Sequence, residues 1–487
     1  MSTALKIIDG RLGIASSRAR MPFRFGVVTM RAAAEATLEL EVEIDGARVR
    51  GYAADMLAYK WFDKRPEKTP ADNVADLIQV VERAIDVARG QPAGPFFEVW
   101  RAIDAEVDRA SVAAGFNRLG ASFGTSMVER AMIDALGRHL GKPVFDMVRD
   151  GDLGIDPGAV MPALAGRSVA EILPAAPARS LHLRHTVGLV DPIDDGDLPA
   201  GKRIGDGLPE SLRDYLDQDG ISYLKVKVGG NLDEDLERLE KIASLTASMG
   251  VTPTVTLDGN EQYRSLDGFA ALIEAVRERG SLADFYRSIL FIEQPLERSV
   301  ALSGPLDPRA LEIIGKPLLI DEADGWTTAY SEAVDLGYFG VSHKNCKGVT
   351  RSMLNALLAR KLNETTTGGQ GRYFMSAEDL TCRPVVSLQA DLAVVAMLGI
   401  DHVERNGHHY FHGLDHLPTA EAEAALQAHG DLYERTGGSV ALRIDGGDLA
   451  IGSLQVPGMG FTPLPDMSAR EAPSSWQFAS LEMDAKP

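Results

Sequence analysis

The chain contains little cysteine and no long apolar segment. Cys346 and Cys382 are the only cysteines among 487 residues, which excludes a disulfide framework and predicts a reducing, cytoplasmic location. No apolar run reaches the roughly 18 residues that a membrane-spanning helix needs, so we expect no membrane association. The N-terminal stretch also lacks the continuous apolar core of a secretory signal.

The chain is short of positive charge as well. It has 50 lysines and arginines against 70 aspartates and glutamates, a formal net charge of −20. Nucleic acids need a basic surface, so we expect no nucleic-acid partner. The remaining composition, 45% hydrophobic and 25% charged, is that of an ordinary globular protein. The length suits two or three domains, or one barrel of roughly 250 residues with further domains.

The first 150 residues or so predict an α+β unit with strands before helices. Apolar and polar residues alternate on both sides of Asp45-Gly46, a dipeptide typical of tight hairpins. The segment "TSMVERAMIDALGRHLGKPV" has helical periodicity. We expect Thr125 to cap this helix, and Gly141 followed by Pro143 to end it.

From about residue 180, short apolar runs alternate with amphipathic helical segments. The ends of these runs recur roughly every 23 to 35 residues, which suits one strand and one helix each. Seven or eight such units predict a closed (β/α)8 barrel, with a doubly wound open sheet as the alternative. The open sheet is less favoured because no strand leads into a GxGxxG turn. The predicted strands are "YLKVKV", "TPTVTLDGN", "ILFIEQP", "KPLLIDEAD", "YFGVSHKN", "RYFMSAEDL" and, more weakly, "DHVERNGHHYF".

Ionisable residues end five consecutive predicted strands. In a parallel barrel these ends open on one mouth, so their side chains converge there. Three carboxylates from neighbouring strands suit a hard cation such as Mg²⁺, with Mn²⁺ as an alternative. The residues are Lys225 and Lys227, Asp258, Glu293, Asp321 with Glu322, and Lys344.

The lysines suit acid–base chemistry beside such a cation. Lys225 and Lys227 share one strand face, and the proximity of a second ammonium lowers a lysine pKa toward the range useful for a general base. Lys344 lies on the strand four places round the barrel, across the mouth from Lys227. Lys227 and Lys344 could therefore each contact one face of a planar enolate. An alternative for Lys344 is a Schiff base with a carbonyl substrate.

These motifs resemble the enolase superfamily, in its muconate lactonizing enzyme branch, over nearly the whole chain. The resemblance implies a modified TIM barrel, (β/α)7β, with an N-terminal α+β capping domain. The implied domains are 1–175 for the cap, 176–430 for the barrel, and 431–487 for a C-terminal segment that returns to the cap. The matching motifs are Lys225-Val-Lys227, Asp258-Gly-Asn260, Glu293-Gln-Pro295, Asp321-Glu322, Lys344, "RMPFRFG" near residue 21 and "VPGMGF" near residue 456.

The resemblance also implies residue roles. Asp258, Glu293 and Asp321 would be the metal ligands, and Lys227 and Lys344 the acid–base pair assisted by Lys225. Asn260 and Glu322 would lie next to the metal ligands without binding the metal themselves. The family's capping loops close over substrate, so Arg24, Tyr59 and Lys60 become substrate-binding candidates, with Arg24 or Lys60 holding a distal anionic group. Glu378 and His409 are further candidates near the ends of the last strands.

The sequence departs from the family pattern in several places. The seventh strand ends in "MSAEDL" and has no histidine, so the histidine base of the mandelate racemase branch is absent there. The cluster "GHHYFHGLDH" places His408 and His412 at zinc-ligand spacing, but no helical pattern or HExxH glutamate supports zinc, which favours packing and loop roles. Cys346 is interpreted as a small core residue.

Together these features predict a Mg²⁺-dependent enzyme that removes the proton α to the carboxylate of a small molecule. Lysines on both faces favour a racemase, epimerase or cycloisomerase. The alternatives are β-elimination by an acid or sugar-acid dehydratase, and a barrel that binds ligand without turnover. The family implies a homo-oligomer.

Overall fold

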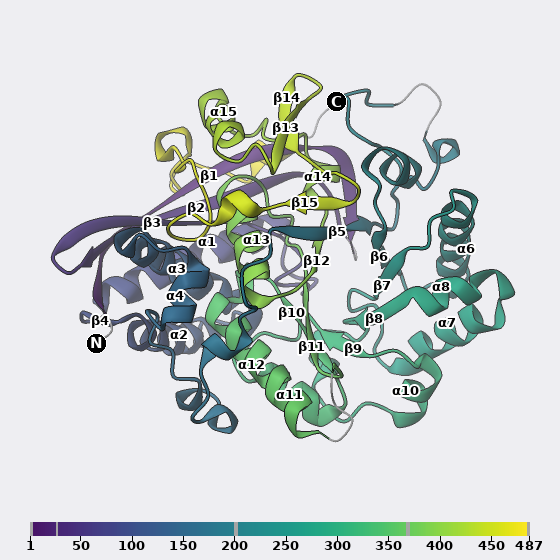
Figure 1. Cartoon of the computed structure of the whole chain (residues 1–487), viewed down its shortest axis with the longest axis horizontal. Coiled ribbons are helices and arrows are strands. Elements are labelled where there is room, and N and C mark those ends of the chain that lie inside the picture. The colour runs from purple at the N-terminus through teal and green to yellow at the C-terminus, as the bar shows by residue number, and fades with distance from the viewer. Residues whose placement is uncertain (1–2, 26–27, 199–202, 367–370, 485–487) are drawn as a thin grey trace.

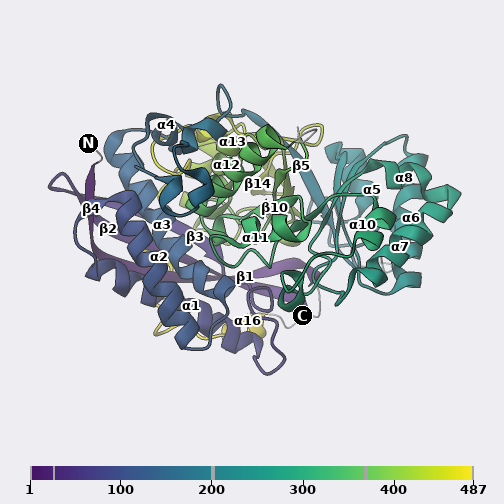
Figure 2. The same ribbon diagram turned by 90° about the horizontal axis from the view of Figure 1, so that it is seen from below.

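The computed structural model describes residues 3–25, 28–198, 203–366 and 371–484. Its N-terminal part is a four-stranded antiparallel sheet in the order β3-β2-β1-β4, packed against helices. Figure 2 shows α1, α2 and α3 beside these strands at one end of the molecule, with the barrel helices α6 to α8 at the other. The strands are β1 (Ala4–Phe25), β2 (Val28–Ile44), β3 (Ala47–Met56) and β4 (Gly94–Pro95), and the helices are α1 (Pro70–Gly90), α2 (Phe96–Ala113), α3 (Arg118–Leu140) and α4 (Val144–Asp150).

The predicted hairpin is confirmed, because β2 and β3 pair antiparallel with Ile44 opposite Ala47. Asp45 and Gly46 both take positive φ, 51° and 78°, as a tight primed turn requires. The helix predicted from "TSMVERAMIDALGRHLGKPV" is α3, and it ends as predicted, with Gly141 in the left-handed conformation. The predicted start of this helix was wrong, because α3 begins at Arg118 and is capped by Asn117, so that Thr125 lies inside the helix.

The second part is a barrel of eight parallel strands, β5 to β12, closed by the pairing of β12 with β5. This confirms the capping-domain-plus-barrel architecture and all seven strands predicted from the sequence. Figure 1 follows the barrel from teal to green. The strands are β5 (Ser180–Val187), β6 (Tyr223–Lys227), β7 (Thr254–Asp258), β8 (Ile289–Glu293), β9 (Leu318–Ile320), β10 (Gly340–His343), β11 (Phe374–Ala377) and β12 (His402–Arg405).

Helices connect the strands, except that the first crossover holds only short helical segments. The helices are α5 (Leu212–Asp214) followed by a π-helix (Tyr215–Asp219), α6 (Leu232–Ser248), α7 (Leu266–Glu278), α8 (Ala283–Ser288), α9 (Arg298–Ala301), α10 (Pro308–Ile314), α11 (Ala329–Leu336), α12 (Val349–Thr365), α13 (Val386–Leu398), α14 (Gly407–Tyr410) and α15 (Thr419–Ala428). Short 3-10 turns lie at Pro157–Ala159, Pro162–Leu164, Val169–Ile172, Asp195–Asp197, Gly280–Leu282, Asn345–Lys347, Gly452–Leu454 and Met467–Ala469.

The C-terminal segment contacts both the barrel and the capping domain. Its strands are the hairpin β13 (Tyr433–Thr436) and β14 (Ser439–Leu442), and β15 (Asp448–Ala450), which adds antiparallel to β5; α16 (Ala479–Asp484) follows. Ile14 of β1 exchanges backbone hydrogen bonds with Glu471, so the segment also reaches the capping sheet. The boundaries at 175 and 430 stay predictions.

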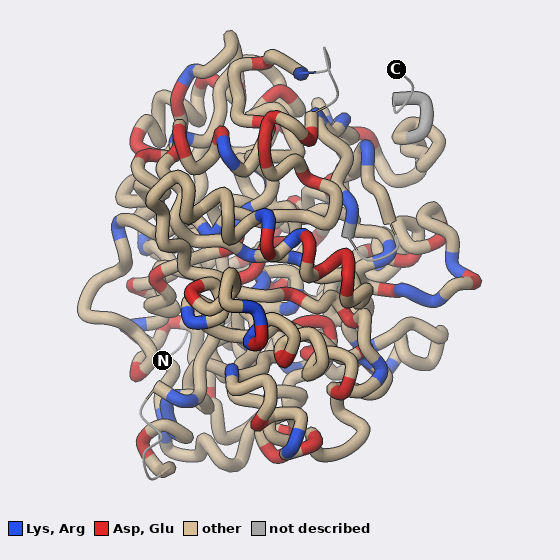
Figure 3. The backbone as a smooth tube through the Cα atoms, turned by 90° about the vertical axis from the view of Figure 1, so that its right-hand side faces the viewer, with Lys and Arg blue, Asp and Glu red and all other residues tan. Residues whose placement is uncertain are grey.

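None of the helices in the described part of the chain has the length and apolar character needed to cross a membrane. Figure 3 shows acidic and basic residues interspersed along the backbone on one side of the molecule.

Candidate active site at the barrel mouth

Buried charged side chains fill the carboxyl ends of the barrel strands, as the sequence predicted. Lys227, Asp258 and Glu293 are the last residues of β6, β7 and β8, and Asp321 and Lys344 directly follow β9 and β10. None of these five side chains is more than 8% exposed. The register of the parallel strands brings the acids together, because Asp258 pairs with both Lys227 and Glu293.

Local hydrogen bonds hold the strand ends in place. The side chain of Gln294, which follows β8 with φ at +32°, accepts a hydrogen bond from the Asp321 backbone N–H at 2.7 Å. The Asn260 backbone N–H donates to Asp258 Oδ1 at 2.8 Å, and its side-chain amide lies 3.4 Å from Asp258 Oδ2. The Glu-Gln-Pro and Asp-Gly-Asn motifs therefore orient carboxylates as well as supplying them.

Lys225 lies at the centre of this network. Its Nζ is 3.0 Å from Asp258 Oδ2 and donates hydrogen bonds of 2.8 Å to Glu293, 2.7 Å to Glu378 and 2.8 Å to Glu404. Burial opposes its charge, but the four carboxylates outweigh burial and raise the Lys225 pKa well above its ordinary value. Lys225 is therefore a fixed ammonium.

The other two predicted lysines each bind one acid. Lys227 Nζ is 2.5 Å from Asp258 Oδ2, and Lys344 Nζ is 2.7 Å from Asp321 Oδ2. Burial would lower the Lys344 pKa, but the Asp321 charge raises it above its ordinary value. The Lys344 ammonium also lies 4.5 Å from the centre of the Trp61 ring, a cation–π contact with the capping domain.

Lys227 and Lys344 line one cavity, called the mouth cavity here. Its volume is about 30 Å³, and the capping domain supplies its apolar wall. It is lined by Phe23, Met56, Ala58, Trp61, Lys227, Asn260, Lys344, Asp379, Leu380, Thr381, Glu404 and Asn406.

The predicted metal ligands are not a preformed set. In the described ranges, no three or more histidine, cysteine, aspartate or glutamate side chains are arranged to hold a metal ion. The reason is that ammonium groups occupy the carboxylates, Lys225 between Asp258 and Glu293, and Lys344 at Asp321.

The residues present nevertheless fit a hard divalent cation. The three acids offer oxygen donors at adjacent strand ends. Burial and the charges of Asp258 and Glu378 raise the Glu293 pKa well above its ordinary value, and burial with the Glu261 charge raises that of Glu322 to about 7. Glu322 Oε2 is buried without a hydrogen-bond partner. This part of the mouth therefore favours additional positive charge.

Glu322 and Asn260 lie together, 3.5 Å apart between Oε1 and Nδ2. Lys64 of the capping domain reaches over Glu322. Lys64 Nζ lies 3.8 Å from Glu322 and 2.5 Å from Glu261.

The structure does not bring most substrate-binding candidates to the mouth cavity. Arg24 is exposed on β1, and Tyr59 packs edge-on against Phe478. Lys60 donates to the backbone carbonyls of Arg65 and Lys68 in its own loop, so it does not point at a substrate. Phe23 and Trp61, the neighbours of Arg24 and Lys60, line the cavity in their place.

Glu378 and His409 are both buried, but neither lines the mouth cavity. Glu378 is bound by Lys225, and Arg184 and Ser376 donate to its other oxygen. His409 Nδ1 is 2.9 Å from the Tyr215 hydroxyl. The packing interpretation of the nearby histidines holds for His412, which pairs with Asp415 at 2.6 Å, and Cys346 is a buried core residue as predicted.

Sequence reasoning missed Glu404 and Lys347. Glu404 lies on β12, lines the mouth cavity and accepts from Lys225 and Thr186. The sequence carried a partial signal, because Glu404 stands next to the last residue of a predicted strand, as the other acids stand at or directly after strand ends. Lys347 is fully buried, with Nζ 3.3 Å from the Asp321 carbonyl and 3.1 Å from Asp324. Its position one turn after Lys344 gave no strand pattern to reveal it.

A parallel barrel with an antiparallel capping sheet and charged strand ends is the fold of the enolase superfamily. The chain is similar to an enolase from Bradyrhizobium complexed with magnesium and mandelic acid, at 17% identity and TM-score 0.59, covering 96% of this chain and 98% of that one. It is similar to a muconate lactonizing enzyme from Pseudomonas fluorescens complexed with muconolactone, at 14% identity and TM-score 0.57, covering 95% and 98%.

A third similar structure is the dipeptide epimerase from Enterococcus faecalis complexed with Mg and the dipeptide L-Leu-L-Tyr, at 14% identity and TM-score 0.59, covering 94% of this chain and all of that one. No protein-family model and no curated protein sequence matches the chain. All three sequence identities are below 20%, so these similarities establish the fold of the chain and nothing about its activity.

Proposed function

We propose that the chain is a Mg²⁺-dependent enzyme of the enolase superfamily that removes the proton α to the carboxylate of a small molecule. The observation that carries the proposal is that Lys227 and Lys344, from strands four places apart, line one cavity above three buried carboxylates. The structural neighbours complexed with magnesium, mandelic acid or a dipeptide support the same chemistry.

Asp258, Glu293 and Asp321 would hold the cation. When bound, Mg²⁺ or Mn²⁺ supplies positive charge that stabilises the enolate oxygen of the substrate. Asn260 keeps Asp258 in orientation, and Glu322 adds negative charge behind the ligands. Lys225 stays charged and fixes Glu293, Glu378 and Glu404 around itself.

Lys227 and Lys344 would move the proton. A group that accepts a proton on one face of the enolate and a group that donates on the other perform a 1,1-proton transfer. The Asp321 charge stabilises the Lys344 ammonium. Loss of that partner would lower the Lys344 pKa and so favour the neutral amine, which can act as a base. Racemisation or epimerisation is the first expectation, and cycloisomerisation needs the same groups.

The capping wall favours a substrate with an apolar body. Phe23, Met56, Ala58 and Trp61 face the cavity, and Lys227 and Lys344 are the only cations among its described lining residues. A second carboxylate on the substrate would therefore lack a partner on the capping side. At about 30 Å³ the cavity holds roughly one water, so the loop carrying Trp61 must open to admit substrate.

The test is deuterium exchange in D₂O with Mg²⁺ present, using 2-aryl and 2-alkyl carboxylates beside dicarboxylates and sugar acids. We expect α-deuteration with a retained carbon skeleton for an apolar acid. Lys227→Ala and Lys344→Ala should each lower the rate about 10²-fold or more, because each removes a proton-transfer group. Lys241→Ala, a surface lysine on α6, is the control and should leave it unchanged.

Full exchange in both mouth variants would contradict the proposed acid–base pair. A 2-keto acid product would reassign the chain to β-elimination. A borohydride-trapped adduct on Lys344 would indicate Schiff-base chemistry instead.

A further inference from the structure

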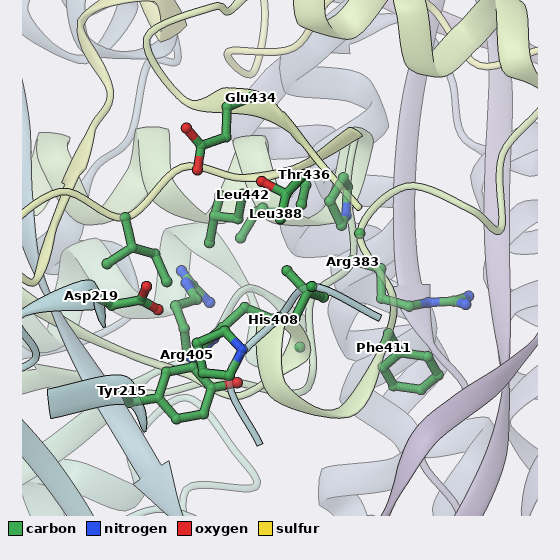
Figure 4. Close-up of a pocket in the computed structure, with 18 of the residues that line it drawn as sticks. Tyr215, Asp219, Arg383, Leu388, Arg405, His408, Phe411, Glu434, Thr436 and Leu442 are labelled. Carbon is green, nitrogen blue, oxygen red and sulfur yellow. The ribbon is translucent and has the colours of Figure 1, made fainter. Parts of the chain in front are cut away.

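A second, larger cavity lies beside the mouth. It is called the side cavity here, has a volume of about 220 Å³, and lies among Tyr215, Asp219, Leu388, His408, Glu434 and Leu442 (Figure 4). Its walls come from the first crossover, from the loops after β11 and β12, and from the β13–β14 hairpin. It takes no part in the proposed chemistry.

Two loops separate the side cavity from the mouth cavity. In the loop after β11, Asp379 to Thr381 line the mouth cavity and Cys382 to Pro384 line the side cavity. Along β12 and its continuation, Glu404 and Asn406 face the mouth cavity, whereas Arg405 and His408 face the side cavity. The cavities therefore have different lining residues and share these two loops as a wall.

The uncompensated charge in the side cavity is negative. Asp219 and Glu434 form no ion pair with any residue in the described ranges, and burial with the nearby Glu434 charge raises the Asp219 pKa to about 7. The two cations of the lining are already compensated, Arg405 by Asp379 at 3.0 Å and by Asp391, and Arg383 by Glu35 at 3.7 Å. Glu434 is exposed, so the cavity opens to solvent on its acidic side.

A buried polar atom independently indicates a missing contact. His408 Nδ1 has no hydrogen-bond partner, although its other ring nitrogen lies 3.0 Å from His185 Nδ1. Burial and the neighbouring His185 hold the His408 pKa well below its ordinary value, so the ring is neutral. Buried polar atoms are usually bonded, which makes this nitrogen a contact point for a ligand.

Apolar side chains form one part of the wall, beside the polar Gln218 and Thr436. They are Leu388, Phe411, Leu442 and Ile444. A cavity of roughly 150 Å³ lined by such residues accommodates a benzene ring. The side cavity therefore has room for a ring or short aliphatic body with a polar group attached.

We propose that the side cavity is a binding site for a small organic amine, with its ammonium group at Asp219 and Glu434 and its aryl or alkyl body against Leu388, Phe411 and Leu442. The inference does not depend on the function proposed for the barrel mouth.

The test is calorimetry on the full chain with 2-phenylethylamine and with its neutral analogue 2-phenylethanol. We expect the amine to bind about tenfold more tightly than the alcohol, because only the ammonium makes a charge-assisted contact. Asp219→Asn should weaken amine binding about tenfold. Asp217→Asn, an exposed neighbour outside the cavity lining, is the matched control and should bind as wild type.

Leu442→Trp provides a second variant, since it fills the cavity from the partly exposed hairpin. It should abolish binding of both probes, with folding checked by circular dichroism. Equal affinity for amine and alcohol, no amine binding by wild type, or amine affinity that survives either Asp219→Asn or Leu442→Trp would overturn the proposal.

Discussion

At the scale of single residues, Lys225 explains how this mouth tolerates so many buried acids. An isolated buried ammonium or carboxylate is strongly disfavoured, and the penalty is offset only by close opposite charges with good hydrogen bonds. Lys225 provides this to carboxylates from β7, β8, β11 and β12 at once. Removing it would leave Glu293 and Glu404 without an ion-pair partner among the described residues, so its first role is electrostatic.

The carboxylates predict a measurable cation affinity. We expect Mg²⁺ to bind the wild-type chain, and Glu293→Gln to bind at least tenfold more weakly because it removes a charged oxygen from the proposed ligand set. Isothermal calorimetry measures both without a substrate. Glu297→Gln, four residues later and paired with Arg264 near the surface, should bind as wild type. Equal affinity in wild type and Glu293→Gln would remove the metal from the proposed function.

The sequence predicted the ionisable residues at the ends of the barrel strands but not the capping-domain residues that contact them. Lys225, Asp258, Glu293 and Lys344 were predictable because strand alternation and the barrel rhythm determine where strand ends point. Lys64 was not assigned to the mouth, since it reaches Glu322 from a loop of another domain. Such contacts depend on how the cap docks, which no local pattern encodes.

At the scale of elements, several glycines lie inside regular structure where two elements pack closely. β1 runs through both Gly10 and Gly13, and no strand was predicted there from the sequence. A Cβ at Gly10 would meet Ile85 at 2.6 Å, and one at Gly13 would meet Arg470 at 2.7 Å. Gly124 likewise lies inside α3, where a Cβ would collide with the backbone carbonyl of Val80. These glycines permit close packing between elements, a reason visible only in three dimensions.

The start of α3 offers a test of how the cap supports the mouth. Asn117 Oδ1 accepts from the Gly120 backbone N–H at 2.7 Å, and its Nδ2 donates to Phe62 O at 2.8 Å, next to Trp61. Asn117→Ala should lower the free energy of unfolding by about 1–2 kcal/mol through loss of the cap. Urea denaturation measures this.

Asn117→Asp is the matched control for this helix start. It keeps the capping oxygen but cannot donate to Phe62 O, so it should recover most of the stability lost in Asn117→Ala. If both variants lost the same free energy, the contact with Phe62 rather than the cap would account for the effect.

At the scale of the whole molecule, the C-terminal segment joins the capping domain to the barrel. β15 extends the barrel at β5, and Glu471 pairs with Ile14 of the capping sheet. The resemblance to the enolase superfamily implied a segment that returns to the cap. The added strand β15 beside β5 was not predicted from the sequence. The homo-oligomer implied by the family stays a prediction.

Asp134 of α3 joins the capping domain to the C-terminal segment. Its Oδ2 accepts from the Tyr52 backbone N–H of β3 at 3.0 Å and from Arg138, and its Oδ1 accepts from the Met459 backbone N–H at 3.0 Å. Asp134→Ala leaves these buried donors without an acceptor, and each buried unpaired N–H costs about 1–3 kcal/mol. We therefore expect a loss of several kcal/mol in urea denaturation, together with faster proteolysis near Met459. Asp146→Ala, which breaks a surface pair with Arg149, should change stability by less than about 1 kcal/mol. A small effect of Asp134→Ala would mean that the segment is held by its apolar contacts alone.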